Sequence, residues 1–210
     1  LLDQQKLVHV AGDRGQDDQE AWMLPLADDP EFADIMINPM RRPSFNRHYY
    51  AQGAQSITEL DTTCILTLHD ISRLRAEIDE MESPLLPIIL PDDPEAGVEP
   101  LYVFLVSPRQ WHHLQTYHDG RGKDWQTFQM NAKQRGSKNP LFAGNAVGLW
   151  NGILVRKSLL PIRFGQGSTV TVAADTADYT ETTVTVPEFS GGGASLDFAV
   201  DRALLLGAQA

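Results

Sequence analysis

The sequence predicts a mixed α+β fold of one or two domains, and three observations support this prediction. Apolar residues recur at spacings of three and four over residues 67–82, which predicts a one-sided helix lying on a core. Residues 101–106 are apolar throughout, as in a strand that is buried on both faces. Thr and Val alternate in residues 169–172 and 182–186, which predicts a two-stranded β excursion.

The helix at 67–82 has start and stop signals. Thr67 and Asp70 have the spacing of a capping pair, although Asp stands where Glu or Gln is usual. Pro84 ends the helix, because the residue before a proline is pushed out of the helical region. The apolar residues 85–90 then predict a strand, and the polar residues 91–97 predict a turn.

Two more helices are expected after the strand at 101–106. Ser107 and Pro108 stand in the N-cap and N1 order that begins a helix, which continues to about Tyr117. A second helix is expected at about 123–134, and Gly136 stops it. The remaining expectations are a loop at 139–145, a turn into a buried strand at 149–155, and a flexible linker at 190–193.

The N-terminal part has no regular periodicity. From residue 13 to residue 60 the pattern fails, and so long an irregular stretch is unusual inside a compact domain. Residues 40–50 interleave Arg with Phe and Tyr, which are residue types that anchor protein interfaces. We therefore expect this stretch to be ordered by packing on another molecule; an ordinary surface loop with aromatic anchors is the alternative.

Composition excludes several classes of protein. The chain has 210 residues with 17 Lys and Arg against 28 Asp and Glu, and its net charge of −11 disfavours non-specific nucleic-acid binding. A single Cys rules out a disulfide framework and a multi-cysteine metal site. The longest apolar stretch, 101–106, is far shorter than the roughly 20 residues of a membrane span. The chain has no initiator Met and stops within an apolar element, so we expect it to be an internal fragment of a longer protein.

Catalytic motifs have no specific support. His112, His113, His118 and Asp119 are the most tempting cluster for a metal or a general base, but no histidine pair has the i, i+4 spacing of a helical metal site. Cys64 is expected to be a buried structural thiol. No Ser stands in a nucleophile elbow, and the glycine-rich segments lack phosphate-loop spacing. We therefore expect no catalytic, metal or cofactor-binding residues.

A string of motifs runs along the chain. It comprises residues 101–114, which read LYVFLVSPRQWHHL, and then residues 124–126, 131–144 and 148–155. This string resembles the major capsid proteins of N4-like tailed bacteriophages. Residues 47–50 with 57–61, and residues 202–210, are similar to the same family in the same order. The resemblance is strongest over 102–155 and extends from about 41 to 210.

The resemblance implies an HK97-like phage capsid fold, with a peripheral domain, an axial domain, an extended loop and an N-terminal arm. On this sequence, residues 1–60 would be the arm and extended-loop region, and residues 61–100 the helix and strand of the peripheral domain. Residues 101–210 would be mainly the axial domain, with a β insertion at about 165–193.

The resemblance also implies a function and partners. The chain would assemble with copies of itself, in hexamers and pentamers, into the shell of a virion that encloses double-stranded DNA. Assembly would take place in the cytoplasm of the bacterial host. Scaffolding, decoration and portal proteins are further candidate partners, whereas DNA would be near the shell without specific binding and no membrane would be involved. The residues expected at subunit contacts are Arg41, Arg42, Phe45, Arg47, Tyr49 and Tyr50.

Two other functions stay open at this point. An encapsulin-like compartment has the same fold and encloses an enzyme, and a cargo-binding groove would distinguish it. A small α/β metal-dependent hydrolase would use His112, His113, His118 and Asp119, and clustering of these four side chains around a pocket would favour it.

Overall fold

The computed structural model describes residues 43–90, 99–116, 124–136, 140–142, 147–159, 162–176, 179–188 and 199–208. Contacts divide the chain into two compact units. The sheet unit comprises Ala51–Ala54, Thr62–Arg163 and Val200–Ala210. The hairpin unit comprises Leu1–Tyr50, Gln55–Asp61 and Phe164–Ala199. Helices and strands occur together, so the predicted α+β class is confirmed.

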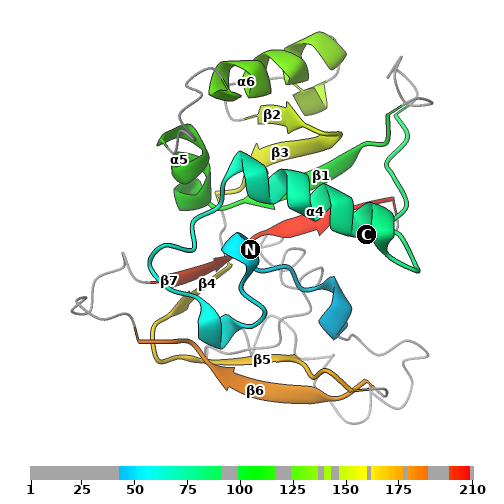
Figure 1. Cartoon of the computed structure of the whole chain (residues 1–210). Coiled ribbons are helices and arrows are strands. Elements are labelled where there is room, and N and C mark those ends of the chain that lie inside the picture. The colour runs from blue at the N-terminus through cyan, green and yellow to red at the C-terminus, as the bar shows by residue number, and fades with distance from the viewer. Residues whose placement is uncertain are drawn as a thin grey trace, which may run out of the picture. The chain divides into compact units, whose positions relative to one another are not determined.

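A four-stranded sheet is the centre of the sheet unit (Figure 1). Its strands are β2 (Val147–Trp150), β3 (Ile153–Lys157), β1 (Tyr102–Val106) and β8 (Leu204–Leu206), in the order β2-β3-β1-β8. β1 pairs with β3 in parallel, and both outer pairs are antiparallel. All of β1 is buried except the half-buried Leu105, which confirms the strand expected at 101–106.

A tight hairpin joins β2 to β3. Asn151 and Gly152 have φ of 48° and 74°, so both lie in the left-handed region that a two-residue hairpin turn requires. A Cβ on Gly152 would lie 2.4 Å from the carbonyl oxygen of Pro100. The turn and buried strand expected at 149–155 are therefore present, and the residues before the turn form a strand as well.

Helix α4 (Leu68–Glu80) follows its predicted capping signal. The Thr67 hydroxyl accepts a hydrogen bond from the Asp70 backbone, and the Asp70 carboxylate accepts one from the Thr67 backbone. Ile71, Leu74 and Ile78 are buried, as the apolar stripe predicted. The helix ends two residues earlier than expected, because Met81 is already in an extended conformation.

Helices α5 (Pro108–Thr116) and α6 (Asp124–Arg135) confirm the two helices expected after β1. An aromatic cluster joins them: the Trp111 ring lies 5.1 Å from that of Trp125 and 5.9 Å from that of Phe128. α6 packs against β2 and thereby covers an edge strand of the sheet (Figure 1). Gly148 on β2 makes room for this contact, since a Cβ there would lie 2.0 Å from Phe128.

The strand predicted at 85–90 is wrong. This segment is extended but joins no ladder: Ile88 donates a backbone hydrogen bond to Leu101, and Leu86 accepts one from Ala208. Pro87 has no N–H to donate, so continuous pairing is interrupted in the middle of the segment. The apolar character still has a role, because Ile88 and Leu90 pack against the core of the sheet unit. That core consists of Leu101, Val103, Ala132, Phe142, Val147, Leu149 and Leu154.

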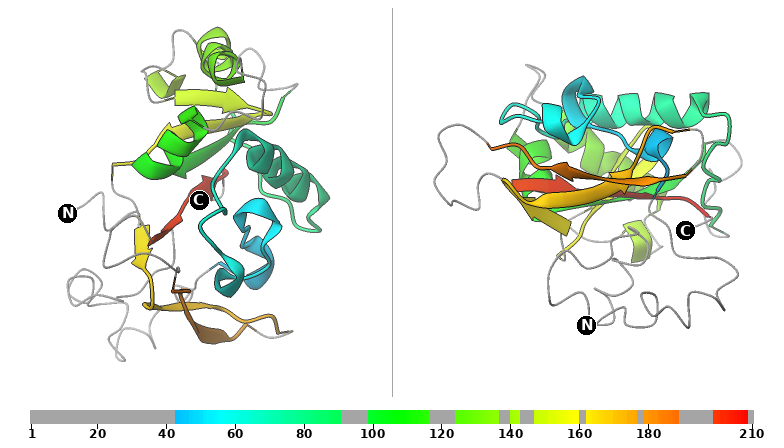
Figure 2. Two further views of the ribbon diagram at one scale, coloured as in Figure 1. Left: turned by 60° about the vertical axis from the view of Figure 1, so that its left-hand side comes forward. Right: turned by 90° about the horizontal axis from the view of Figure 1, so that it is seen from below.

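The hairpin unit is built on β5 (Thr169–Ala173) and β6 (Glu181–Thr185), which pair in antiparallel fashion and lie side by side in both views of Figure 2. This confirms the two-stranded excursion expected from the Thr and Val alternation. Val170 and Val172 are buried, as is Ile57 on the short turn η3 (Ile57–Glu59), which contacts β6. The linker expected at 190–193 lies outside the described residues.

Two short strands, β4 (Ile162–Gly165) and β7 (Ala199–Arg202), pair with each other. The boundary between the two units crosses both strands, after Arg163 and after Ala199. Residues 43–60 contain three 3-10 turns, η1 (Phe45–Arg47), η2 (Ala51–Gly53) and η3, and no strand or α-helix. The irregular stretch expected at 13–60 is thus confirmed for its described part. Among the described helices, none has the length and apolar character needed to cross a bilayer.

Candidate subunit-contact site

Residues 43–50 contain the part of the predicted contact set that the structure describes, and we call them the contact segment. Phe45 and Arg47 lie on η1 and are exposed, Phe45 by 40%. Tyr49 and Tyr50 are half-buried, and the Tyr50 ring meets that of His48 edge to face at 6.5 Å. The other two members of the predicted set, Arg41 and Arg42, lie outside the described residues. The contact segment therefore exposes an aromatic ring and a cation on the same short turn.

The turn η2 follows the contact segment and is anchored by Gln52. Gln52 has φ of 59°, and its backbone N–H donates to the Asp70 carboxylate at 3.0 Å. Its side-chain amide donates to the same carboxylate at 3.2 Å and to the Ile65 carbonyl at 3.3 Å. Asp70 is buried and also receives the Thr67 hydroxyl proton at 2.7 Å. One carboxylate thus caps α4 and holds the turn η2 against the helix start.

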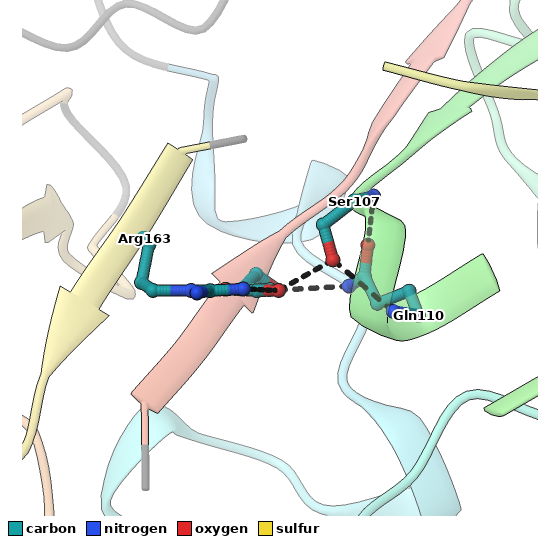
Figure 3. A network of polar contacts seen from close by, with 4 residues as sticks. Ser107, Gln110 and Arg163 are labelled. Atoms are coloured by element: carbon teal, nitrogen blue, oxygen red, sulfur yellow. Dashed lines mark hydrogen bonds and ion pairs between the residues drawn. The ribbon is translucent and has the colours of Figure 1, made fainter. Parts of the chain in front are cut away.

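The junction between β1 and α5 carries a second polar site. The Ser107 hydroxyl accepts the Gln110 backbone N–H at 3.1 Å, and the Gln110 amide oxygen accepts the Ser107 N–H at 2.9 Å. These reciprocal bonds are a capping box, and they confirm Ser107 as the N-cap (Figure 3). The Ser107 hydroxyl in turn donates to the carboxylate of Asp201 on β7.

Asp201 is the centre of this polar network. Its side chain is 7% exposed, and the Arg163 guanidinium meets it with two bonds, at 2.5 and 2.8 Å. The Gln110 amide donates to the Asp201 carbonyl at 2.9 Å. The hydrogen bond to Asp201 raises the pKa of Arg163 above its usual value. Within the sheet unit, the network ties β7 to the start of α5.

Sequence reasoning found only part of the Asp201 network. The Ser107–Pro108 signal identified the cap, and Gln110 at the third helical position is a further local signal that could have completed it. Asp201 is 94 residues away from Ser107 in the chain, so no local pattern connects them.

The described histidines of α5 show no sign of a metal centre. The rings of His112 and His113 lie 6.4 Å apart on α5, whereas His118 and Asp119 lie outside the described residues. In the part of the chain that the structure describes, no three His, Cys, Asp or Glu side chains are grouped to hold a metal ion. Burial, helped by the nearby charges of His112 and Arg109, lowers the pKa of His113 against the opposing effect of Asp201.

Cys64 differs from the expectation of a buried thiol. It is half-buried, in the stretch of residues that leads into α4 without regular structure.

The fold is that of a phage capsid subunit. The chain matches a solved structure of the capsid of Ralstonia phage GP4 with a TM-score of 0.58 and 20% sequence identity. The match covers 98% of this chain and 47% of that chain, so the sequence spans about half the length of that subunit. This likeness shows the fold, a mixed α+β architecture of the HK97-like class.

Family membership comes from the sequence itself. The family model described as phage capsid protein matches residues 1–210, and the chain belongs to this family. A comparison with curated proteins gave no match. Family and fold together identify a structural coat protein and favour neither an encapsulin-like compartment nor a metal-dependent hydrolase.

Proposed function

We propose that this chain is part of the major capsid protein of an N4-like tailed bacteriophage, a subunit that assembles into an icosahedral shell around double-stranded DNA. The observation that carries this proposal is the match of the phage capsid family model to the whole chain. The likeness to the phage GP4 capsid subunit supports it at the level of fold. In this function the chain performs no catalytic step and needs no cofactor.

The contact segment supplies anchors between neighbouring subunits in hexamers and pentamers. Exposure of Phe45 and Arg47 supports this assignment, because aromatic and Arg side chains are typical interface anchors. Gln52, which follows the contact segment closely in sequence, is held on α4 by its hydrogen bonds to Asp70. We extend the assignment to Arg41, Arg42, Tyr49 and Tyr50, which stand in the same stretch of sequence.

The domains of the capsid fold are assigned as follows. Residues 1–60 form the arm and extended-loop region, 61–100 belong to the peripheral domain, and 101–210 belong mainly to the axial domain. The irregular backbone of residues 43–60 and the four-stranded sheet around β1 support these assignments. Grouping of Phe164–Ala199 apart from the sheet unit supports an insertion at about 165–193.

Further partners follow from this role. Scaffolding, portal and decoration proteins would bind the growing or finished shell, and assembly would take place in the host cytoplasm. The shell would enclose DNA without specific recognition, in keeping with a net charge of −11.

Particle formation by the full-length protein tests the proposal. We expect sedimentation over a series of protein concentrations to reveal large particles, and negative-stain electron microscopy to show closed shells. Particles purified from infected cells should contain double-stranded DNA, whereas an enclosed enzyme would indicate a compartment instead. A monomer or dimer at every concentration, even when scaffolding protein is co-expressed, would contradict the proposal.

A further inference from the structure

The strands of the sheet unit and helix α5 are basic although the chain is acidic. Within this unit, described residues 101–116, 147–159, 162–163 and 200–208 contain five Arg and Lys residues against one acidic residue, Asp201. That carboxylate is already paired with Arg163. These segments therefore have an excess of positive charge, in contrast to the net charge of −11 of the whole chain.

The basic residues gather where β1 and β3 end. The parallel register places Arg156 opposite Leu105 and Lys157 opposite Val106, and Arg109 lies on the first turn of α5, directly after β1. The N-terminus of α5 adds the positive end of a helix dipole. Lys157 is exposed and forms no ion pair with any described residue. We call Arg109, Arg156, Lys157 and the neighbouring Leu159, which is 79% exposed, the basic end.

The opposite end of the same strands is acidic. The Arg75 guanidinium of α4 lies 5.1 Å from the ring centroid of Tyr102, the first residue of β1. The indole N–H of Trp150, next to the hairpin turn, donates to Ser72 at 2.8 Å. The middle of α4 therefore lies near the amino ends of β1 and β3. The segment just after the helix reaches the same place, since the Tyr102 hydroxyl donates to the Leu85 carbonyl at 3.2 Å. Figure 1 shows α5 at the other end of these strands.

Three exposed glutamates, Glu77, Glu80 and Glu82, stand at this end, in the last turns of α4 and directly after it. They form no ion pair with described residues, and the last turn of the helix has no basic residue. Carboxylates at a helix C-terminus face the negative end of the dipole, which is electrostatically unfavourable. Exposed Leu86 and Ile89 lie nearby, since Ile88 donates its N–H to Leu101, the residue before β1. These five residues are the acidic end.

We propose that the basic end of one copy of this chain docks on the acidic end of a second copy. Each end combines charged side chains of one sign with exposed apolar surface, Leu159 at the basic end and Leu86 with Ile89 at the acidic end, as protein interfaces do. The two surfaces differ, so the contact is heterologous, and heterologous contacts that close form rings such as capsomers. The inference rests on the proposed function, because it names one of the contacts by which subunits assemble.

A second copy fits the basic end better than DNA does. The complementary charges are present on the same chain, on a helix end that is electrostatically unfavourable without a partner. The net charge of −11 opposes binding to a polyphosphate.

Charge reversal on each side tests the contact. In the full-length protein, Lys157→Glu and Glu80→Lys should each raise the protein concentration at half-assembly by about threefold or more, since an exposed attraction becomes a repulsion. Light scattering and sedimentation under the conditions in which the wild type assembles measure this concentration. The double variant Lys157→Glu with Glu80→Lys should return to within about twofold of the wild type, because opposite charges meet again.

Matched variants separate the contact from net charge and folding. Lys133→Glu on α6 and Glu188→Lys in the hairpin unit change charge by the same amount at other exposed positions and should leave assembly unchanged. No variant should unfold at a lower temperature than the wild type, because every substituted side chain is exposed. Glu80→Lys should raise thermal stability slightly, because a cation then stands at the negative end of the α4 dipole.

Three results would overturn the inference. In the first, the single reversals do not differ from the matched controls. In the second, the double variant assembles no better than the two singles together. In the third, Lys157→Glu weakens binding to a short DNA duplex and leaves assembly intact, which assigns the basic end to phosphate. Failure of the wild type to assemble under any condition would instead contradict the proposed function itself.

Discussion

Asp70 stabilises two pieces of chain through one buried carboxylate. It accepts hydrogen bonds from the Thr67 backbone and hydroxyl and from the Gln52 backbone and amide. Asp70→Ala should therefore lower the free energy of unfolding by about 2 kcal/mol or more, because the cap is lost and buried donors lose their acceptor. Urea denaturation measures the change.

A matched control for Asp70 is available on the same helix. Asp79 is exposed and pairs with Arg75 one turn before it, so Asp79→Ala should cost less than about 0.5 kcal/mol. Equal losses for the two variants would contradict the role assigned to Asp70.

Gly148 is required by the ring that packs on it. A Cβ at this position would lie 2.0 Å from a ring carbon of Phe128, whose side chain is fully buried. Gly148→Ala should lower the free energy of unfolding by roughly 1–3 kcal/mol through overpacking. Gly165→Ala is the control, because a Cβ there meets no atom within 4 Å. Thermal unfolding that changes equally in both variants would show that space around Phe128 is not the cause.

His113 makes stability depend on pH. Burial and the neighbours His112 and Arg109 lower its pKa below the ordinary value of 6.5, against the effect of Asp201. The unfolded chain then binds the proton more readily than the folded chain, so stability is present above pH 6.5 and is lost as the pH falls below it. His113→Gln should reduce this loss in thermal unfolding measured from about pH 8 to about pH 5. A pH profile that is identical in the variant would be evidence against this assignment.

At the scale of elements, the contact segment differs from the helices and strands because it exposes an aromatic side chain on irregular backbone. Phe45 is exposed on a single 3-10 turn. Phe45→Gln should weaken assembly of the full-length protein and change the free energy of unfolding by less than about 1 kcal/mol. Met130→Gln on α6 replaces another exposed apolar side chain and should leave assembly unchanged. If Phe45→Gln lowers stability and spares assembly, Phe45 packs within its own subunit.

Elements with a strong local signal were predicted correctly. The helix at 68–80 has an apolar stripe and a capping box, and β1 is apolar along its whole length. The segment 85–90 shows the limit of this reasoning. Its apolar composition suited a strand, but Pro87 cannot join a ladder, and the segment buries Ile88 and Leu90 without one.

Only the parts of the candidate site that have a local sequence signal were predicted. Residue types identified the contact segment, and the N-cap Ser107 was visible from its neighbour Pro108. The partners of Ser107 and Gln52 were not visible, because Asp201 and Asp70 are distant in sequence and hydrogen bonds between distant residues leave no local period.

At the scale of the whole molecule, charge is arranged rather than evenly spread. The sequence shows a net charge of −11, and only the sheet places Arg109 and Lys157 together at the ends of β1 and β3. Contacts of β1 with Leu85 and of Leu101 with Ile88 place the segment after α4, with Glu82 and Ile89, at the other end of these strands. A shell subunit with unlike ends can join copies in series, and for this reason the charge-reversal pair tests assembly more directly than net charge does.

Local pattern by itself determined the α+β class, the three helices, the buried strand β1 and the β5–β6 hairpin, and the order of its motifs indicated the capsid family. Periodicity and capping act over a few residues, so they can be read from the chain directly. Only the tertiary structure decided the strand order β2-β3-β1-β8, the network around Asp201 and the opposite charges of the two ends. These features depend on which distant segments pair, and pairing is selected by the packing of the whole core rather than by any one stretch of sequence.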